Sequence, residues 1–344
     1  MVKSHVLIIS PALANANNGN WQTARRWCGF LRNGHRVACA LSWPGSDQAQ
    51  SGMEGSGEPG TALPAPDVMI ALHARRSAPS IAAFAGRYPA RPLILVLTGT
   101  DLYRDIAHDP AAQQSLLMAT KLVVLQAAGL DALPPSLRAK ARVIHQSAPG
   151  LAVASRRGAR HFRVAMIGHL RPEKAPEIFM AAAACVQTPH VRLLQIGAAL
   201  DPALGRAAAC TALATPGYTW AGALPHAATR QRLRHSDLMV ISSRMEGGAN
   251  VIIEAVTCGV PVLASDIPGN RGMLGADYAG YFPLDDAAAL ARAIDRAATD
   301  PAFLDLLRRQ CTVRAALFAP AIERAAVREL VDNLALLPMQ EQPS

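Results

Sequence analysis

The stretch LMVISSRMEGGANVIIEAVTCGVPVLA, residues 238–264, decides how this chain folds. The apolar run Leu238–Ile241 predicts a buried strand, and two glycines follow it. Apolar residues at helical spacing then predict a helix over Ala249–Cys258, and the run Val260–Ala264 predicts the next strand. This strand–helix–strand order is the building unit of a parallel α/β sheet.

The same alternation of short apolar runs and longer amphipathic ones continues along the rest of the chain. The expected strands are His5–Ser10, Val37–Leu41, Val68–Leu72, Leu93–Leu97, Lys121–Leu125, Ala141–Ile144, His161–Ile167, Val191–Ile196, Tyr218–Trp220, Leu238–Ile241 and Val260–Ala264. The expected helices are Trp21–Arg32, Ala175–Val186, Pro202–Leu213, His226–Arg234, Ala249–Cys258, Asp286–Thr299, Pro301–Leu317 and Pro320–Leu336. We therefore predict the α/β class, with two Rossmann-like, doubly wound domains facing a central cleft. Such sheets bind ligands at the carboxyl ends of their strands.

The domain bounds follow from breaks in this pattern. We place an N-terminal domain at residues 1–150, a C-terminal domain at 160–318, and a last helix and tail at 319–344 that could pack back on the N-terminal domain. The stretch Ser147–His161 is rich in proline, glycine and arginine, and it is the expected linker.

The stretch 44–66 is rich in glycine, serine and proline and predicts a mobile surface insertion. It contains the string GSGEPG at Gly55–Gly60, which has the spacing of a dinucleotide-binding fingerprint. That fingerprint works only as a turn between a strand and a helix, and this copy has neither beside it. We therefore reject a dinucleotide site there.

Composition narrows the class of protein. The chain has 344 residues, 51% of them hydrophobic, which suffices for two cores and excludes global disorder. The formal net charge of +9 fits a nucleic-acid binder, but aromatic residues are only 5% and no five basic residues are consecutive. We favour solvated arginines together with a cleft for phosphate-bearing substrates, and we expect no nucleic-acid partner.

The cysteine pattern and the N-terminus point to a cytoplasmic protein. Six cysteines are scattered through apolar stretches without a CxxC pair, so we expect buried free thiols. The first apolar run is too short for a signal peptide, and no stretch is long enough to span a membrane. The sequence makes no prediction of the oligomeric state.

The strongest candidate site is the loop between Ile241 and the following helix. Its glycines would let a phosphate approach the backbone, and the amides at the helix start would face that phosphate. Two carboxylates, Glu246 and Glu254, could bind sugar hydroxyls at either end of a diphosphate. The alternative is an ordinary capped helix with solvated glutamates. The nucleotide-contacting residues predicted here are Arg244, Gly247, Gly248, Ala249, Asn250, Val251 and Glu254.

A second candidate site is the turn Gly168–Lys174, which directly follows a predicted strand. It presents Arg171 and Lys174 at the carboxyl end of that strand, where both could meet the charge of a diphosphate. The alternative is a solvated basic turn.

Polar residues also follow three predicted strands of the first half. His73 precedes two arginines, and Thr98–Asp101 precedes Tyr103 and Arg104. The string Asn17–Asn20 lies before the first helix, where an anion could bind, although it could equally be a plain loop. The acceptor-side residues predicted here are Asn20, Arg75, Arg76, Thr100, Asp101 and Arg104.

These motifs carry a resemblance to a known family. Glu246 and Glu254 resemble the paired glutamates of the retaining glycosyltransferases of the GT-B fold, and the turn ending at Lys174 resembles their phosphate-binding turn. The resemblance implies that Arg171 and Lys174 grip the phosphates of UDP. It further implies that Glu254 binds the ribose, Glu246 and His73 lie beside the transferred sugar, Gly19 lies near the diphosphate, and Leu224 lies near the uracil.

Six strings are similar, more narrowly, to the selenosugar synthases of selenoneine biosynthesis: ALHARRSAPSI, LTGTDLYRD, GHLRPEK, IGAALDP, SSRMEGGANVIIEA and LASDIPGNRGMLG. This resemblance implies transfer of a sugar from UDP-N-acetylglucosamine or UDP-glucose to selenophosphate, without a metal cofactor. The alternative is a glycosyltransferase with an ordinary hydroxyl acceptor. A nicotinamide-dependent oxidoreductase would share the α/β alternation, but it lacks a fingerprint in context.

Three positions depart from the family pattern. His169 stands where many members have an arginine, so Arg171 could have taken over its role. Thr98 replaces a histidine, and a glutamate is missing near Gly272. These departures suggest an acceptor other than the usual sugar or lipid alcohol.

Overall fold

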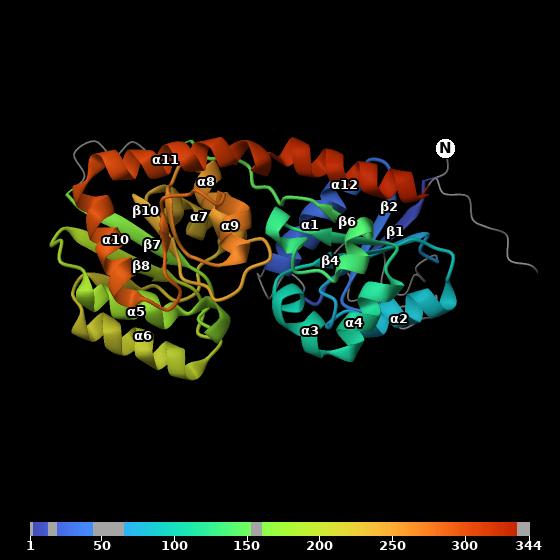
Figure 1. Cartoon of the computed structure of the whole chain (residues 1–344), viewed down its shortest axis with the longest axis horizontal. Helices are drawn as coiled ribbons and strands as arrows, with labels where there is room; N and C mark the ends of the chain where they lie inside the picture. Colours follow the sequence, from blue (N-terminus) through green and yellow to red (C-terminus); the bar gives the residue numbers. More distant parts are fainter. Residues whose placement is uncertain (1–2, 13–18, 44–64, 153–159, 336–344) are drawn as a thin grey trace, which may run out of the picture. The chain divides into compact units, whose positions relative to one another are not determined.

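The computed structural model describes residues 3–12, 19–43, 65–152 and 160–335 (Figure 1). The chain divides into two compact units, of which the first comprises Met1–Gln146 with Pro320–Ser344 and the second comprises Ser147–Ala319. Residues 147–150, which we had placed in the N-terminal domain, thus fall in the second unit. The GSGEPG string and all but the last two residues of the expected insertion 44–66 lie outside the described residues.

The first unit is built on a parallel six-stranded sheet in the order β2-β1-β3-β4-β5-β6. Its strands are β1 (His5–Ile9), β2 (Arg36–Ala40), β3 (Val68–Leu72), β4 (Leu93–Leu97), β5 (Lys121–Val124) and β6 (Ala141–Val143). Its helices are α1 (Gly19–Leu31), α2 (Ala78–Arg87), α3 (Ile106–His108), α4 (Pro110–Met118) and α12 (Pro320–Ala335), with the short turns η2 (Asp101–Asp105), η3 (Ala127–Gly129) and η4 (Pro135–Lys140).

Both faces of this sheet are covered, as a parallel sheet requires. Successive side chains of a strand point to opposite faces, so Val6 and Ile8 of β1 join a core with α1 and α12. Leu7 and Ile9 of the same strand join a second core with α2 and α4. The predicted doubly wound α/β class is thereby confirmed for this unit.

The second unit has a parallel six-stranded sheet in the order β12-β11-β10-β7-β8-β9. Its strands are β7 (Phe162–Ile167), β8 (Val191–Ile196), β9 (Tyr218–Trp220), β10 (Leu238–Ile241), β11 (Val262–Ser265) and β12 (Tyr281–Phe282). Its helices are α5 (Pro176–Cys185), α6 (Pro202–Ala214), α7 (His226–Arg234), α8 (Asn250–Thr257), α9 (Pro268–Leu274), α10 (Ala287–Thr299) and α11 (Pro301–Ala315), with the short 3₁₀ turns η5 (Pro172–Lys174) and η6 (Ala316–Phe318).

Each sheet has a point at which its strand order reverses. In the second unit, β7 lies between β8 and β10, so the loops after β7 and β10 leave the sheet on either side of that point. In the first unit, β1 lies between β2 and β3, which makes the loops after β1 and β3 the corresponding pair. Loops that part at such a point leave an opening for a ligand.

The last helix, α12, belongs to the first unit and packs beside α1 (Figure 1). Its Glu323 is 1% exposed and accepts hydrogen bonds from Arg26 Nε at 2.7 Å and from Trp27 Nε1 at 2.8 Å. A buried carboxylate needs such partners, because burial without them would be costly.

Cys185 and Cys210 are exposed, so the prediction that every thiol is buried is wrong. Both lie in alanine-rich helices, where the apolar pattern does not distinguish the inner face from the outer one.

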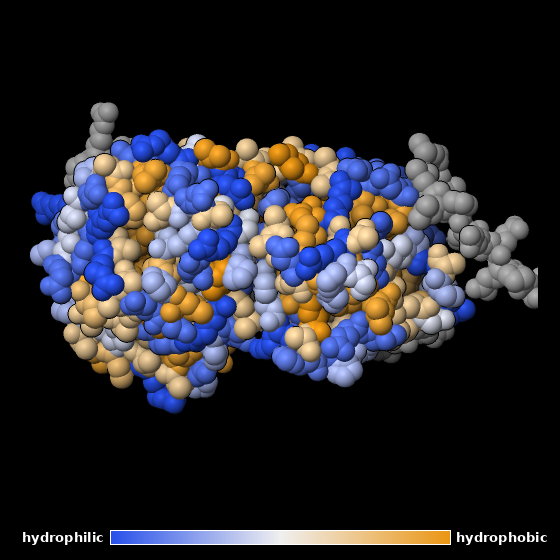
Figure 2. Space-filling view, viewed as in Figure 1, coloured by the Kyte–Doolittle hydropathy of each residue, from blue (hydrophilic) through white to orange (hydrophobic). Residues whose placement is uncertain are grey.

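Hydrophilic residues are spread over both units on the face drawn in Figure 2. Within the described residues, none of the helices has the length and the apolar character needed to span a bilayer.

Candidate functional site

Two loops from distant parts of the sequence meet at the reversal point of the second sheet. One follows β7 and carries Lys174, and the other follows β10 and carries Glu246. The Lys174 Nζ group and the Glu246 Oε1 atom form an ion pair. Their side chains are only 19% and 9% exposed. The structure therefore brings together two residues that the sequence analysis had assigned to separate motifs.

The turn after β7 is pressed against the loop that follows β8. His169 Nδ1 accepts a hydrogen bond from the Ala198 N–H at 3.1 Å. A Cβ atom on Gly197 would lie 1.9 Å from the carbonyl oxygen of Gly168, so only glycine fits there. Because His169 braces this turn, Arg171 remains our candidate for the phosphate contact.

The helix α8 begins at Asn250 without a side-chain cap, since Ala249 occupies the N-cap position. Gly247 and Gly248 precede it, and the helix is anchored by buried apolar residues on its inner face. The first amides of a helix have no partner within the helix, and its dipole attracts negative charge. This helix start is therefore suited to bind an anion.

The helix α9 braces the loop that carries Glu246. A Cβ atom on Gly269 would lie 1.9 Å from the backbone oxygen of Glu246, so helix and loop are in direct contact. Asn270 Nδ2 donates to the Ser265 carbonyl oxygen at 2.9 Å, and Ser265 Oγ donates to the Ser243 carbonyl oxygen at 2.6 Å. Glu246 is thus presented by a rigid backbone.

Glu254 has a partner that the sequence analysis missed. His226, the first residue of α7, lies with its Nε2 2.7 Å from the Glu254 Oε1 atom. The Glu254 side chain is 12% exposed and the His226 side chain is 41% exposed, so the pair faces partly toward solvent. Leu224, which we predicted near the base, lies just before α7 and accepts from Thr229 Oγ1 at 3.4 Å through its carbonyl oxygen.

Arg244 is held by three contacts within the second unit. Its guanidinium group contacts Glu177 Oε1 at 2.8 Å, Asp285 Oδ1 at 2.8 Å and the Pro172 carbonyl oxygen at 2.9 Å. The hydrogen bond to Asp285, aided by Glu177, raises the pKa of Arg244 above its ordinary value. These contacts hold the turn that precedes α5, and the contact of Arg244 with the nucleotide stays a prediction.

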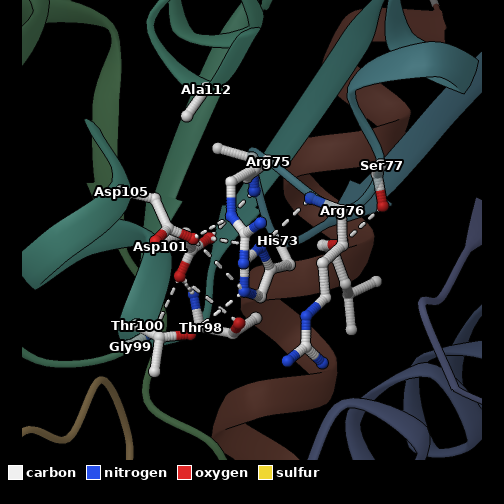
Figure 3. A network of polar contacts seen from close by, with 12 residues as sticks. His73, Arg75, Arg76, Ser77, Thr98, Gly99, Thr100, Asp101, Asp105 and Ala112 are labelled. Atoms are coloured by element: carbon white, nitrogen blue, oxygen red, sulfur yellow. Dashed lines mark hydrogen bonds and ion pairs between the residues drawn. The ribbon is translucent and has the colours of Figure 1, made fainter. Parts of the chain in front are cut away.

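The first unit has its own polar cluster, centred on His73 directly after β3 (Figure 3). His73 has a φ of 74°, in the left-handed region that residues other than glycine rarely adopt. Its Nδ1 accepts from the Arg76 N–H at 3.4 Å, which leaves the proton on Nε2, 3.0 Å from Thr100 Oγ1. Burial lowers the pKa of His73, and nearby Asp101 opposes this without reversing it. The ring is therefore a neutral donor at neutral pH.

Asp101 joins the two loops that build this cluster. Its carboxylate is fully buried and accepts from the N–H groups of Ala74, Thr98 and Gly99, each at 2.9 Å (Figure 3). We had predicted that Asp101 contacts an acceptor. Both oxygens accept from backbone amides, so Asp101 supports the backbone around His73, and its contact with an acceptor stays a prediction.

Asp105, a residue the sequence analysis did not select, gathers two of the predicted arginines. It accepts from Arg75 Nε at 2.8 Å and from Arg104 Nε at 3.0 Å. Burial alone would raise the pKa of Asp105, but the two guanidinium groups outweigh it and hold the pKa below its ordinary value. Arg76 is exposed on the same turn, so the cluster combines three arginines with two buried carboxylates.

Gly19 and Asn20 form the first turn of α1, which begins two residues earlier than predicted. Thr23 Oγ1 donates to the Gly19 carbonyl oxygen at 2.8 Å. Asn17 and Asn18, the other members of that string, lie outside the described residues. In the described part of the chain, no hydrogen bond joins Gly19 or Asn20 to the His73 cluster.

Comparison with known proteins gives this arrangement a context. Residues 161–300 match the family of glycosyl transferases group 1. The D-inositol 3-phosphate glycosyltransferase of Segniliparus rotundus is 37% identical over 112 residues, which are 31% of this chain and 25% of that protein. The enzyme of the same name from Mycolicibacterium vanbaalenii is 32% identical over 160 residues, 41% of this chain and 34% of that protein. The chain thus spans a quarter to a third of these curated relatives.

Solved structures match over almost the whole chain. HepE of Anabaena, in complex with UDP and glucose, has a TM-score of 0.72 at 16% identity and is covered over 100% of its length by 96% of this chain. The sucrose-phosphate synthase of Thermosynechococcus elongatus has a TM-score of 0.77 at 18% identity, covering 96% of this chain and 99% of that one. At such identities the likeness shows the fold alone.

The two parallel six-stranded sheets and these neighbours define the GT-B fold. Within it, residues 161–300 of this chain match the group 1 glycosyltransferases.

Proposed function

We propose that this protein is a glycosyltransferase that moves a sugar from UDP-N-acetylglucosamine or UDP-glucose to selenophosphate, giving a 1-seleno-sugar. One observation carries the transferase part: in the segment matching group 1 glycosyltransferases, Lys174 and Glu246 meet at the reversal point of the sheet, next to an uncapped helix start. The Lys174 ammonium group, which the Glu246 carboxylate holds in place, and the amides at the helix start suit a diphosphate.

In the proposed donor site, Arg171, Lys174 and the start of α8 hold the diphosphate of UDP. Glu254 binds the ribose and Glu246 lies near the sugar. These positive groups would stabilise the charge that develops on UDP as it leaves. Donors arranged in advance for such charge contribute a factor of roughly 10² to 10³ each. The HepE structure, which holds UDP and glucose, supports a UDP-sugar in a fold of this kind.

The proposed acceptor site is the cluster around His73 on the first unit. Selenophosphate is an anionic, soft nucleophile, so it needs positioning more than a base. Its selenium would attack the anomeric carbon while the bond from that carbon to the UDP oxygen breaks, with the electron pair leaving on UDP. Hydrolysis of the selenium–phosphorus bond would then release phosphate. Exposed Arg75, Arg76 and Arg104 supply the positive charge for the phosphoryl group.

A phosphorylated alcohol is the second candidate acceptor. The curated relatives are named D-inositol 3-phosphate glycosyltransferases, so their acceptor carries a hydroxyl group and a phosphate. The same arginines could hold that phosphate, and neutral His73 could contact the hydroxyl group. The two acceptors therefore share a phosphoryl anion and differ in the nucleophilic atom.

A direct assay separates these candidates. Purified protein is incubated with each UDP-sugar and either selenophosphate or inositol 3-phosphate, and mass spectrometry detects UDP and the glycosylated product. We expect UDP release and a seleno-sugar with selenophosphate alone. Turnover with inositol 3-phosphate but not with selenophosphate would refute selenophosphate as the acceptor and would still support glycosyltransferase activity. Absence of UDP binding by calorimetry would remove the donor site as well.

We also propose that transfer needs no metal ion, because Lys174, Arg171 and the start of α8 supply the positive charge near the diphosphate. Turnover should be unchanged in excess EDTA, and a loss that added Mg²⁺ restores would contradict this.

A further inference from the structure

The side chains of Arg75 and Arg104 both reach the surface, and both donate a hydrogen bond to one buried carboxylate, that of Asp105. Asp105 is 6% exposed, whereas the side chains of Arg75 and Arg104 are 41% and 44% exposed. Each arginine contacts Asp105 through its Nε atom, one on Oδ2 and the other on Oδ1. One oxygen of the carboxylate therefore serves each guanidinium group, and Figure 3 shows Asp105 beside Arg75.

This arrangement fixes two long side chains that would otherwise be mobile. A guanidinium group is a planar fork with five N–H donors, so a hydrogen bond at Nε sets the plane in which the terminal donors lie. Ordering such side chains costs entropy, and here the protein has met that cost before a ligand arrives.

The backbone beneath the arginines is equally constrained. Arg75 lies two residues after His73, whose φ of 74° is strained, and the intervening Ala74 N–H is held by Asp101. Strain of this kind persists only where the surroundings enforce it, and it clusters at functional sites. The Asp105 Oδ2 atom that holds Arg75 is also 3.9 Å from His73 Nε2, so the carboxylate lies close to the histidine as well as to the arginines.

We propose that Asp105 is the positioning residue of an oxyanion site, which aims Arg75 and Arg104 at a tetrahedral dianion of the phosphoryl class. This inference rests on the proposed function, in which that dianion is part of the acceptor. Asp105 does not touch the acceptor, and its effect passes through the two arginines.

The two possible roles of Asp105 predict opposite changes in anion affinity. If Asp105 acted only through its negative charge, it would repel an anion, and replacing it with Asn would tighten anion binding. Acting by position, it prearranges the donors, so the same replacement would weaken anion binding by about tenfold, as two arginines must then be ordered on binding.

The experiment is calorimetric titration of the full chain with inorganic thiophosphate, a stable analogue of selenophosphate, in the wild type and in Asp105→Asn. Asp305→Asn is the matched control, because Asp305 pairs with Arg308 at 2.9 Å on an exposed helix face of the second unit. We expect a roughly tenfold weaker affinity in Asp105→Asn, partial recovery in Asp105→Glu, and no change in the control. In turnover assays the acceptor KM should rise while the donor KM stays constant.

Equal or tighter thiophosphate binding by Asp105→Asn would overturn the proposal, as would a wild type that binds no thiophosphate. Should Asp105→Asn fail to fold, Arg75→Lys decides, because lysine keeps the charge and loses the fork. Wild-type affinity in that variant would also overturn the proposal. UDP binding to the wild type is measured in parallel. A wild type that binds thiophosphate but not UDP would refute the proposed donor and would still support the oxyanion site.

Discussion

The ammonium group of Lys174 and the carboxylate of Glu246, 72 residues apart in sequence, form an ion pair where β7 and β10 end. Replacing Lys174 with Met should weaken UDP binding by roughly 10- to 100-fold, since a hydrogen bond to a charged group contributes about 1.5–3 kcal/mol. Glu246→Gln should leave UDP affinity nearly unchanged and lower turnover. Calorimetry with UDP checks the first variant, and the idea fails if Lys174→Met binds UDP like the wild type.

The pair formed by His226 and Glu254 gives a graded prediction. Glu254→Ala should raise the Kd for UDP by about tenfold, because a charge-assisted hydrogen bond to the ribose is lost. His226→Ala should raise it less, since His226 only orients Glu254 across 2.7 Å. A larger effect in His226→Ala than in Glu254→Ala would reverse their assigned roles.

Gly269 should tolerate no larger residue. A Cβ atom there would meet the backbone oxygen of Glu246, so Gly269→Ala must displace the loop carrying that carboxylate. We expect a lower Tm and reduced turnover. Gly29→Ala is the control, because its Cβ would meet nothing within 4 Å and it lies inside α1. That change should stabilise by roughly 0.5–1 kcal/mol. Equal melting temperatures for both variants would contradict this prediction, because the loop would then accept the added Cβ atom without loss of stability.

Glu323 should be among the most sensitive positions of the first unit. Glu323→Ala leaves Arg26 and Trp27 without their acceptor in a site that is 1% exposed, and breaking a buried pair costs about 3–5 kcal/mol. Glu329→Ala removes an exposed pair with Arg142, where solvent screens the charges, and should change little. Urea denaturation compares the two, and similar losses would contradict the role given to burial.

His73 should make stability depend on pH. Its pKa is lowered in the folded protein, while the unfolded chain has an ordinary value of about 6.5. The unfolded state therefore binds a proton first as the pH falls. The stabilisation is complete above about 6.5 and is lost as the pH drops toward the folded pKa. The wild type should melt at a lower temperature at pH 5.5 than at pH 7.5, and His73→Asn, which tolerates left-handed backbone, should show a smaller difference. If the Tm difference between the two pH values is the same in both proteins, His73 does not contribute to the pH dependence of stability.

Local patterns were sufficient to predict most of the fold. The run Leu238–Ile241, the glycines after it and the helix that follows are all visible within one short stretch, and the structure confirms them. The strand β12 escaped prediction because two residues are too few to show a period. The start of α1 at Gly19 was missed because Gly and Asn usually indicate a loop.

The site was harder to predict, because its contacts join distant residues. Lys174 and Glu246 were each selected from their own motif, but only the strand order of the sheet places them in contact. Asp101 and Asp105 lie four residues apart in one polar string, and nothing in that string tells which carboxylate binds amides and which binds arginines. Burial decides between such roles, and burial is a property of the folded chain.

The position of α12 has a consequence for how the protein is made. The core beneath α1 takes Val327, Leu330 and Val331 from this helix, and Trp27 bonds to its Glu323. Synthesis proceeds from the N-terminus, so α1 leaves the ribosome long before the helix that covers it. Until then the part of this sheet face that α12 covers is exposed to solvent, and the nascent chain would be a natural client for chaperones that bind exposed hydrophobic surface.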